Sequence, residues 1–266
     1  MLEIAGYIAA VLIGVSLGTI GGGGSILTVP VLVYLFGVAP LPATAYSLFI
    51  VGITALAGSF AYMRAREVDY RAALHFGVPS LVAVFLTRSM LVPALPDTLF
   101  SLAGMAVTRD LFIMLLFAAL MLAASVSMIR RTKPIVGTET RRAKPLLAVL
   151  EGVVVGVLTG LVGAGGGFLI IPALVLLGGL PMKQAVGTSL LIIAAKSLIG
   201  FTGDALRVPM DWGFLATISA LAILGIVLGA LLARRLRPET LKPAFGWFTL
   251  LMGTAILFKE LLHHTR

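Results

Sequence analysis

Long apolar runs constrain this chain more than any other feature. Most of its 266 residues lie in stretches long enough to cross a bilayer as a helix, joined by short polar connections, and such a crossing takes about 20 mostly apolar residues. Charged residues make up 12% of the chain, whereas about 25% is usual in soluble domains. The pattern therefore predicts an all-α polytopic membrane protein and excludes an ordinary soluble domain.

An internal repeat is the second constraint. The segment that begins at Gly14 aligns without gaps to the segment that begins at Gly156, and this shift of 142 positions (156 − 14 = 142) holds as far as Asp69 and Asp211. About a third of the aligned positions are identical, and internal repeats are common in transporter folds. We therefore divide one transmembrane domain, residues 1–266, into a first repeat, a cytoplasmic linker and a second repeat. Their bounds are 1–133, 134–145 and 146–266.

Each repeat is predicted to contain five membrane segments. They cover roughly 4–20, 26–37, 42–63, 72–93 and 110–129 in the first repeat, and 146–162, 168–180, 182–202, 212–233 and 243–262 in the second. The second segment of each set is too short for a straight crossing. It is either a piece of a broken span or one arm of a re-entrant hairpin, with glycine-rich backbone near the midplane.

Basic residues set the expected orientation. They gather in two connections, formed by Arg130, Arg131, Lys133, Arg141, Arg142 and Lys144, and by Arg234, Arg235, Arg237 and Lys242. The positive-inside rule places both connections in the cytoplasm. Counting crossings then puts Arg64, Arg66 and Arg71 inside. It puts Asp204, Arg207 and Asp211 outside. Corresponding turns of the two repeats thus face opposite sides, which makes the repeats inverted and leaves both termini outside the cytoplasm.

Two glycine clusters are the most specific local signal. They comprise Gly21, Gly22, Gly23, Gly24 and Ser25 in the first repeat, and Gly163, Gly165, Gly166 and Gly167 in the second. Glycine leaves backbone N–H groups accessible, and such groups at a helix start can bind an anion. The alternative is that these glycines only let helices pack closely, as small residues do in membranes. Inverted repeats would bring both clusters to the midplane, where transporters of this kind bind substrate.

Hydroxyl side chains lie at matched depth in the two repeats. They are Thr44 and Ser47, with Tyr46 between them, and Thr188 and Ser189. Such groups can donate hydrogen bonds to an oxyanion, or they can bond back to carbonyls of their own helix. The sequence leaves these two alternatives open.

Two cations, Arg88 and Lys196, interrupt apolar runs. A charge inside a span is unfavourable and is by default a functional candidate. Lys196 lies about two turns from Ser189 on nearly the same helix face, so it is a candidate to neutralise an anion there. Either side chain can instead extend to the membrane interface, which is the expectation that we favour for Arg88.

Other kinds of chemistry find little support. The chain has no cysteine, so thiolate ligands and nucleophiles are excluded, and His75, His263 and His264 lack metal-site spacing. Asp69 and Asp211 start helical segments, where a carboxylate caps N–H groups. We predict no metal, no cofactor, no nucleic-acid partner and no enzymatic activity.

The chain resembles the sulfite exporter TauE/SafE family, also called the TSUP anion permease family. The most specific matching pieces are Gly160-Leu-Val-Gly-Ala-Gly-Gly-Gly-Phe-Leu-Ile-Ile-Pro172 and Val186-Gly-Thr-Ser-Leu190. The resemblance covers almost the whole chain. It implies a multi-pass protein of the bacterial cytoplasmic membrane that carries a sulfur-containing anion, such as sulfite, thiosulfate or an organosulfonate, in sulfur metabolism.

The sequence thus predicts a permease, a secondary transporter whose central site combines both glycine clusters with the hydroxyls and the cations. An anion channel of the same architecture would use the same residues and stays open as an alternative. The expected protein partner is a second copy of the chain, in a homodimer. The choice among these anions, the direction of transport, the coupling ion and the oligomeric state stay open.

Overall fold

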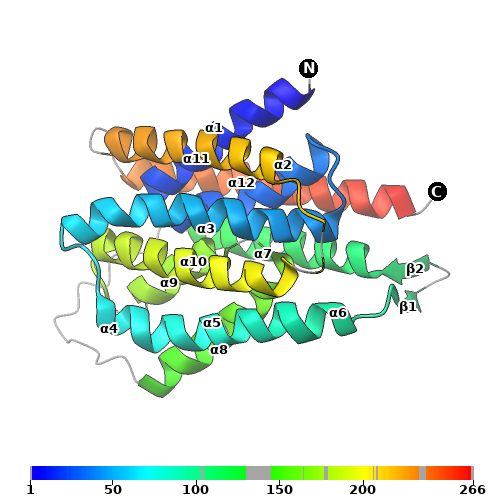
Figure 1. Cartoon of the computed structure of the whole chain (residues 1–266), viewed down its shortest axis with the longest axis horizontal. Helices are drawn as coiled ribbons and strands as arrows, with labels where there is room; N and C mark the ends of the chain where they lie inside the picture. Colours follow the sequence, from blue (N-terminus) through cyan, green and yellow to red (C-terminus); the bar gives the residue numbers. More distant parts are fainter. Residues whose placement is uncertain are drawn as a thin grey trace.

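The protein is a bundle of helices with one small β-hairpin (Figure 1). This computed structural model describes residues 2–102, 105–129, 145–163, 165–176, 179–205, 207, 209–233 and 238–264. Among these residues, six helices are long and apolar enough to cross a membrane. The polytopic membrane class is therefore confirmed, and the described fold is nearly all-helical rather than all-α. Two basic segments lie outside the described residues. They are 130–144, which contains the predicted linker except Pro145, and 234–237, and together they hold most of the clustered basic residues.

The elements follow the predicted segments closely. In the first half they are α1 (Leu2–Ile20), the 3-10 helix η1 (Gly22–Leu27), α2 (Thr28–Tyr34), α3 (Pro40–Arg64), a continuous helical segment from Tyr70 to Ala94, and α7 (Arg109–Ile129). That continuous segment consists of α4 (Tyr70–Ala72), η2 (Ala73–Gly77), α5 (Val78–Leu86), η3 (Thr87–Leu91) and α6 (Val92–Ala94), of which η2 and η3 are π-helical. In the second half they are α8 (Pro145–Val162), α9 (Gly167–Leu176), α10 (Met182–Asp204), α11 (Trp212–Ala233) and α12 (Pro238–His264).

Two helices are capped at their N-termini by the aspartates that the sequence predicted. The Asp69 carboxylate accepts hydrogen bonds from the N–H groups of Arg71 and Ala72 at 2.9 and 3.0 Å, and the Asp211 carboxylate accepts one from Phe214 at 2.9 Å. Both aspartates satisfy donors that the first turn of a helix leaves free. The predicted capping role is confirmed for both.

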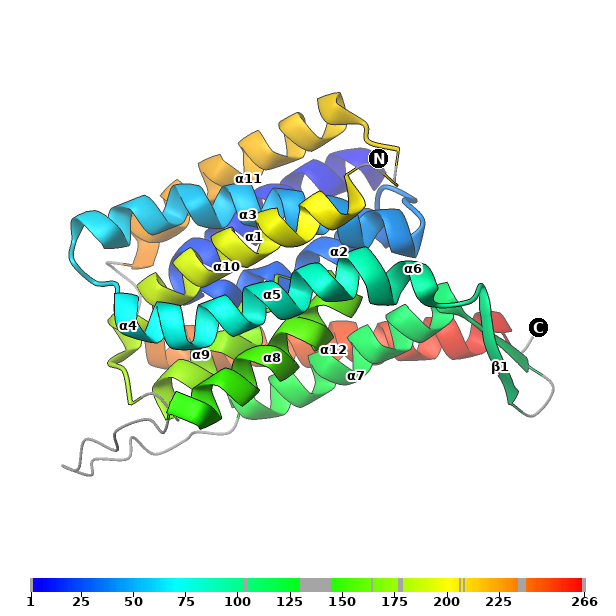
Figure 2. The same ribbon diagram turned by 60° about the horizontal axis from the view of Figure 1, so that its bottom comes forward.

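Each short segment is the returning arm of a hairpin. The N-terminus and the loop between α2 and α3 lie at the same end of the bundle (Figures 1 and 2), so the chain reverses between α1 and α2. Gly21 at this reversal has a φ of 77°, and Gly163, at the reversal between α8 and α9, has a φ of 69°. Residues with a side chain rarely adopt this left-handed conformation. The glycine clusters therefore form the turns of two helical hairpins.

At the centre of the bundle, α3 and α10 lie side by side and run in opposite directions (Figures 1 and 2). Around them, α1 packs along α11, α5 along α8, and α7 along α12. Glycines allow the first two of these contacts to be close, since a Cβ built on Gly14 would collide with the Ala222 carbonyl and one on Gly156 with the Ser80 carbonyl. Small residues serve the same purpose in other membrane bundles.

A β-hairpin between α6 and α7 was not anticipated. Its strands, β1 (Thr98–Leu102) and β2 (Met105–Thr108), pair antiparallel. Arg109 closes the base of the hairpin, because its N–H donates to the Asp97 carbonyl at 3.0 Å and its guanidinium lies 3.1 Å from the Asp97 carboxylate. The predicted membrane segments end at 93 and begin again at 110, so these residues were treated only as a connection.

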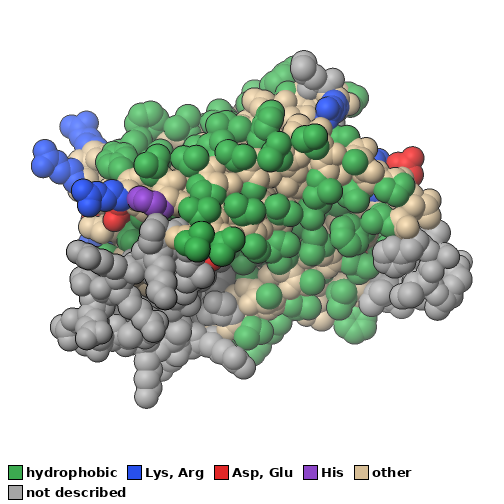
Figure 3. All heavy atoms as spheres, turned by 90° about the horizontal axis from the view of Figure 1, so that it is seen from below, with side chains coloured by type: hydrophobic (Ala, Val, Ile, Leu, Met, Phe, Trp, Pro, Cys, Tyr) green, Lys and Arg blue, Asp and Glu red, His purple; other side chains and the backbone are tan. Residues whose placement is uncertain are grey.

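The surface separates into an apolar belt and polar ends (Figure 3). Large apolar side chains such as Leu224, Trp247 and Leu251 are more than half exposed, as a lipid-facing surface requires. Lysine and arginine gather at one end, which includes the exposed residues Arg64 and Arg66 and is called the basic end below. The opposite end carries β1 and β2 and is called the β-hairpin end.

Candidate functional site

Two cations are buried in the interior of the bundle. Arg88 lies on η3, Lys196 lies on α10, and both side chains are 0% exposed. Extension of either cation to the membrane interface, which we had favoured for Arg88, is therefore wrong in this structure. The reason is that η3 packs against both α8 and α10, and this packing covers Arg88. A buried charge is stable only with partners that compensate it.

Lys196 has one polar partner among the described residues. Its Nζ donates a hydrogen bond to Thr159 Oγ1 on α8 at 2.9 Å, and Thr159 in turn donates to the Val155 carbonyl at 2.7 Å. The ammonium also lies beside Gly166, where a Cβ would come within 2.6 Å of Nζ. The lysine is thus held between α8 and the second glycine cluster, with donors left for another acceptor.

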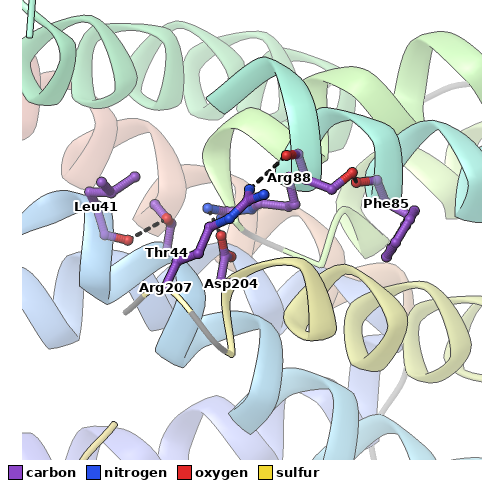
Figure 4. Close-up of polar contacts among 7 residues, drawn as sticks. Leu41, Thr44, Phe85, Arg88, Asp204 and Arg207 are labelled. Atoms are coloured by element: carbon purple, nitrogen blue, oxygen red, sulfur yellow. Dashed lines mark hydrogen bonds and ion pairs between the residues drawn. The ribbon is translucent and has the colours of Figure 1, made fainter. Parts of the chain in front are cut away.

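Arg88 forms an ion pair with Asp204 at the end of α10. The distance from Arg88 Nη1 to Asp204 Oδ2 is 3.2 Å, and the Asp204 side chain is 6% exposed. Figure 4 shows the two side chains close together, with Arg207 beside them. Within the described part of the chain, however, Nε, Nη1 and Nη2 of Arg88 all lack a hydrogen-bond acceptor. Since buried polar groups are normally satisfied, Arg88 is well suited to bind an oxyanion.

The second glycine cluster connects the two cations. A Cβ built on Gly163 would lie 2.6 Å from Arg88 Nη2, and one built on Gly165 would lie 3.2 Å from Ser197 Oγ. Gly165 and Gly166 also have left-handed φ values, 65° and 75°. Only glycine fits this backbone between the side chains. The cluster therefore places backbone without side chains between two positive charges. Such an arrangement is suited to binding an anion.

The first glycine cluster has different neighbours. Gly21 faces Ile171 and Val186, and the Cα of Gly22 packs against that of Gly167. Ser25 Oγ donates to the Gly22 carbonyl at 2.7 Å within the same turn. These contacts are those of close packing, and a substrate-binding role for Gly21 to Ser25 stays a prediction.

The hydroxyls are divided between several roles. Thr44 donates to the Leu41 carbonyl at 2.7 Å and Ser189 to the Val186 carbonyl at 2.8 Å, so both bond back to their own helix. Thr188 Oγ1 accepts from the N–H of Asp69 at 2.9 Å. Ser47 is fully buried, and its Oγ has no hydrogen-bond partner within the described residues.

The structure therefore brings together only part of the predicted set. Arg88, Lys196, Thr44 and the second cluster share contacts, and Gly22 of the first cluster packs on Gly167 of the second. Thr188 and Ser189 make their described hydrogen bonds elsewhere. Sequence analysis missed Thr159, Ser197 and Asp204. Asp204 was assigned to an outside turn because the predicted segment ended at residue 202. The signal that could have found it is the rule that charges inside membranes pair with one another.

Two further observations concern other parts of the bundle. A cavity of about 300 Å³ opens at the β-hairpin end, lined by Glu3, Tyr7, Phe36, Val38, Tyr46, Asp211 and Phe214. Its two carboxylates make it a poor place for an anion. No group of three or more His, Asp or Glu side chains that could hold a metal occurs in the described ranges.

Comparison with known proteins places the chain among membrane transporters. The family described as Sulfite exporter TauE/SafE matches residues 7–256. The chain is 28% identical to the probable membrane transporter protein YunE of Bacillus subtilis, over 95% of this chain and 98% of that protein. It is 30% identical to a probable membrane transporter protein of Xylella fastidiosa, over 94% and 92% of the two chains.

A probable membrane transporter protein of Haemophilus influenzae is 28% identical, over 96% of this chain and 95% of that one. No solved structure matches the chain significantly. The match to the family extends through both hairpins and all residues of the buried site. The chain is therefore a multi-pass membrane protein that belongs to the sulfite exporter TauE/SafE family.

Proposed function

We propose that this protein is a secondary transporter that moves a small sulfur-containing anion, such as sulfite, thiosulfate or an organosulfonate, across the bacterial cytoplasmic membrane. The observation that carries the proposal is the pair of buried cations on either side of the second glycine cluster. Arg88 and Lys196 supply two positive charges and Asp204 one negative charge. The ionised site is therefore net positive, as an anion-binding site must be.

Burial of both cations favours a carrier over an open channel. A channel needs a continuous aqueous path past its selective groups, whereas Arg88 and Lys196 are both 0% exposed. A site that is closed to water must open to one side at a time if an anion is to pass. This behaviour is alternating access, and we take it as the mechanism.

Contacts between aligned positions support the inverted repeat. Gly14 packs on the Ala222 carbonyl and Gly156 on the Ser80 carbonyl, and both pairs are related by the same shift (156 − 14 = 222 − 80 = 142). The antiparallel arrangement of α3 and α10 also supports an inverted repeat.

A second exchanged pair agrees with it. The N–H of Asp69 donates to Thr188 Oγ1 and that of Asp211 donates to the Tyr46 hydroxyl, each at 2.9 Å. Positions 46 and 188, like 69 and 211, differ by 142. Each repeat thus supplies a hydroxyl that accepts from the helix cap of the other. Under this proposal, rocking of one repeat against the other opens the site alternately.

The distribution of basic residues supports an orientation of the protein in the membrane. Arg64 and Arg66 lie at the basic end, which the positive-inside rule assigns to the cytoplasm. The β-hairpin end, with both termini, then faces outward. A homodimer stays a prediction of the sequence.

The test is transport by the purified protein in liposomes. Uptake of radiolabelled sulfite and thiosulfate is compared for the wild type, Lys196→Ala and the control Lys183→Ala, which changes an exposed lysine at the start of α10. We expect saturable flux with counterflow in the wild type and the control. In Lys196→Ala we expect flux to fall about 10-fold or more, because a buried charge that contacts the anion is lost. Full activity of Lys196→Ala would remove the lysine from the site, and an absence of flux for both anions in the wild type would contradict the sulfur-anion proposal.

A further inference from the structure

The buried ion pair between Arg88 and Asp204 occupies the group that an anion would use. A guanidinium has five N–H donors, and in this structure its nearest negative charge is the Asp204 carboxylate at 3.2 Å. An incoming oxyanion must share Arg88 with Asp204 or replace it. If Asp204 stays ionised while Arg88 turns to the substrate, a carboxylate is left buried without its counter-charge. Such a state is strongly unfavourable.

Charge counting sharpens this point. With Arg88 and Lys196 positive and Asp204 negative, the site has a net charge of +1. A doubly charged anion such as thiosulfate would change the net charge to −1 inside a water-excluded bundle. One proton on Asp204 restores neutrality, and low-dielectric surroundings favour the neutral combination.

We propose that Asp204 is the proton-binding group of this transporter, so that one proton travels with each dianion that binds between Arg88 and Lys196. This inference rests on the proposed function and adds its coupling ion. The proton comes from bulk water at the β-hairpin end and is bound by a carboxylate oxygen of Asp204. In the state open to the basic end, the anion leaves, Asp204 releases the proton to that side, and the carboxylate pairs with Arg88 again.

The surroundings of Asp204 suit this role. Its side chain is buried except for 6% of its surface, while Arg88 is fully covered, and Asp204 lies at the end of α10 that points toward the β-hairpin end (Figure 1). The charged groups that act on the carboxylate are Arg88 from η3 and Arg207 from the segment after α10. Arg207 is exposed and donates to the Ser89 carbonyl at 2.6 Å, which holds it beside the pair (Figure 4). From the start of α11, Asp211 uses its carboxylate to cap that helix.

The experiment measures protons and thiosulfate together. Liposomes that contain the protein and an internal pH dye receive a gradient of radiolabelled thiosulfate, with the membrane potential clamped by potassium and an ionophore. For the wild type we expect acidification of the lumen by one proton per thiosulfate. For Asp204→Asn we expect thiosulfate exchange without proton movement and a loss of the dependence on external pH. Asp97→Asn, which removes a carboxylate that is 91% exposed near the β-hairpin, should keep the wild-type ratio.

The outcomes separate the two proposals. Thiosulfate flux without acidification in the wild type, or an unchanged proton ratio in Asp204→Asn, overturns the proton-coupling role alone. An absence of thiosulfate flux in the wild type overturns the proposed function and this inference with it. If Asp204→Asn does not fold, Asp204→Glu decides, because a longer carboxylate should retain coupling but shift the external pH at which transport is half-maximal. An unchanged half-maximal pH in that variant overturns the inference.

Discussion

The two glycine clusters share a sequence pattern and a turn, yet they lie in opposite chemical surroundings. Around the second cluster are Arg88, Lys196, Thr159 and Ser197, whereas the first contacts mainly apolar side chains and backbone. The difference comes from single positions of the repeat. Thr159, Ser197 and Lys196 align with Leu17, Ala55 and Thr54, and Arg88 and Asp204 align with Ala230 and Tyr62.

This comparison separates scaffold from site. The glycines that make the turns and the helix contacts recur in both repeats, so the architecture is symmetric in its packing. The charges occur in one place only, so the chemistry is asymmetric. A repeat that is conserved in packing but varied at a few buried positions can therefore form one site from two similar hairpins. The following predictions test that division, beginning with the largest expected effect.

Loss of Arg88 should have the greatest effect on stability. Arg88→Met leaves the Asp204 carboxylate buried without its cation, which is expected to cost about 3–5 kcal/mol. The double variant Arg88→Met/Asp204→Asn should recover most of this loss, because both charges are then absent. Thermal unfolding in detergent measures both variants. Equal destabilisation of the single and double variants would contradict the importance of the ion pair.

Glycine substitutions at aligned positions of the two clusters should separate loss of stability from loss of transport. Gly163→Ala and Gly21→Ala both place a side chain at positive φ, 69° and 77°, and this backbone strain should cost each about 1–2 kcal/mol. Gly163→Ala should lose more stability, because its Cβ would also lie 2.5 Å from the Thr44 carbonyl oxygen. Gly163→Ala also brings a methyl group within 2.6 Å of Arg88 Nη2, so it should reduce anion flux per folded molecule as well. Gly21→Ala should leave that normalised flux near the wild-type value. A similar loss of flux in both variants would assign the first cluster to the site too.

The Thr159 hydroxyl, which accepts from Lys196, should matter more than the Thr54 hydroxyl, which lies in the other repeat at the position that aligns with Lys196. Thr159→Val removes the 2.9 Å hydrogen bond to the ammonium and should weaken apparent anion affinity by about 1–1.5 kcal/mol, or roughly 10-fold. Thr54→Val, at the position that aligns with Lys196, removes only a bond to the Ile50 carbonyl of its own helix. Its effect on affinity should be negligible. Concentration dependence of uptake distinguishes the two results.

The smallest effect concerns the symmetric scaffold. Tyr46→Phe and Thr188→Val each remove a hydroxyl that accepts from the N–H of a capping aspartate in the other repeat. Each hydrogen bond lost should lower stability by about 0.5–1.5 kcal/mol, with little change in transport. Tyr46→Phe should lose somewhat more, because the Tyr46 hydroxyl also donates to the Pro209 carbonyl at 3.2 Å. Unfolding temperatures give the comparison. A large effect in one variant and none in the other would argue against equivalent roles in two inverted repeats.

Much of the fold followed from the sequence because its signals are local. The predicted segment 42–63 became Pro40–Arg64, and 212–233 became Trp212–Ala233, since length and apolarity alone define such helices. The β-hairpin at Thr98–Thr108 was missed because the residues between the predicted segments 72–93 and 110–129 were treated only as a connection. For the candidate site, the cations were recognised individually, but their partners Asp204 and Thr159 were not.

The sequence by itself determined the membrane-embedded class, the approximate helix positions and the positions of the glycine turns, because apolar length and backbone freedom act within a few residues of the chain. Only the tertiary structure decided that Arg88 faces inward to Asp204 and that Lys196 meets Thr159, since these partners are brought together from different helices. It also decided which glycine cluster lies beside the charges. The physical reason is that compensation of a buried charge depends on distances across the bundle, which no local pattern contains.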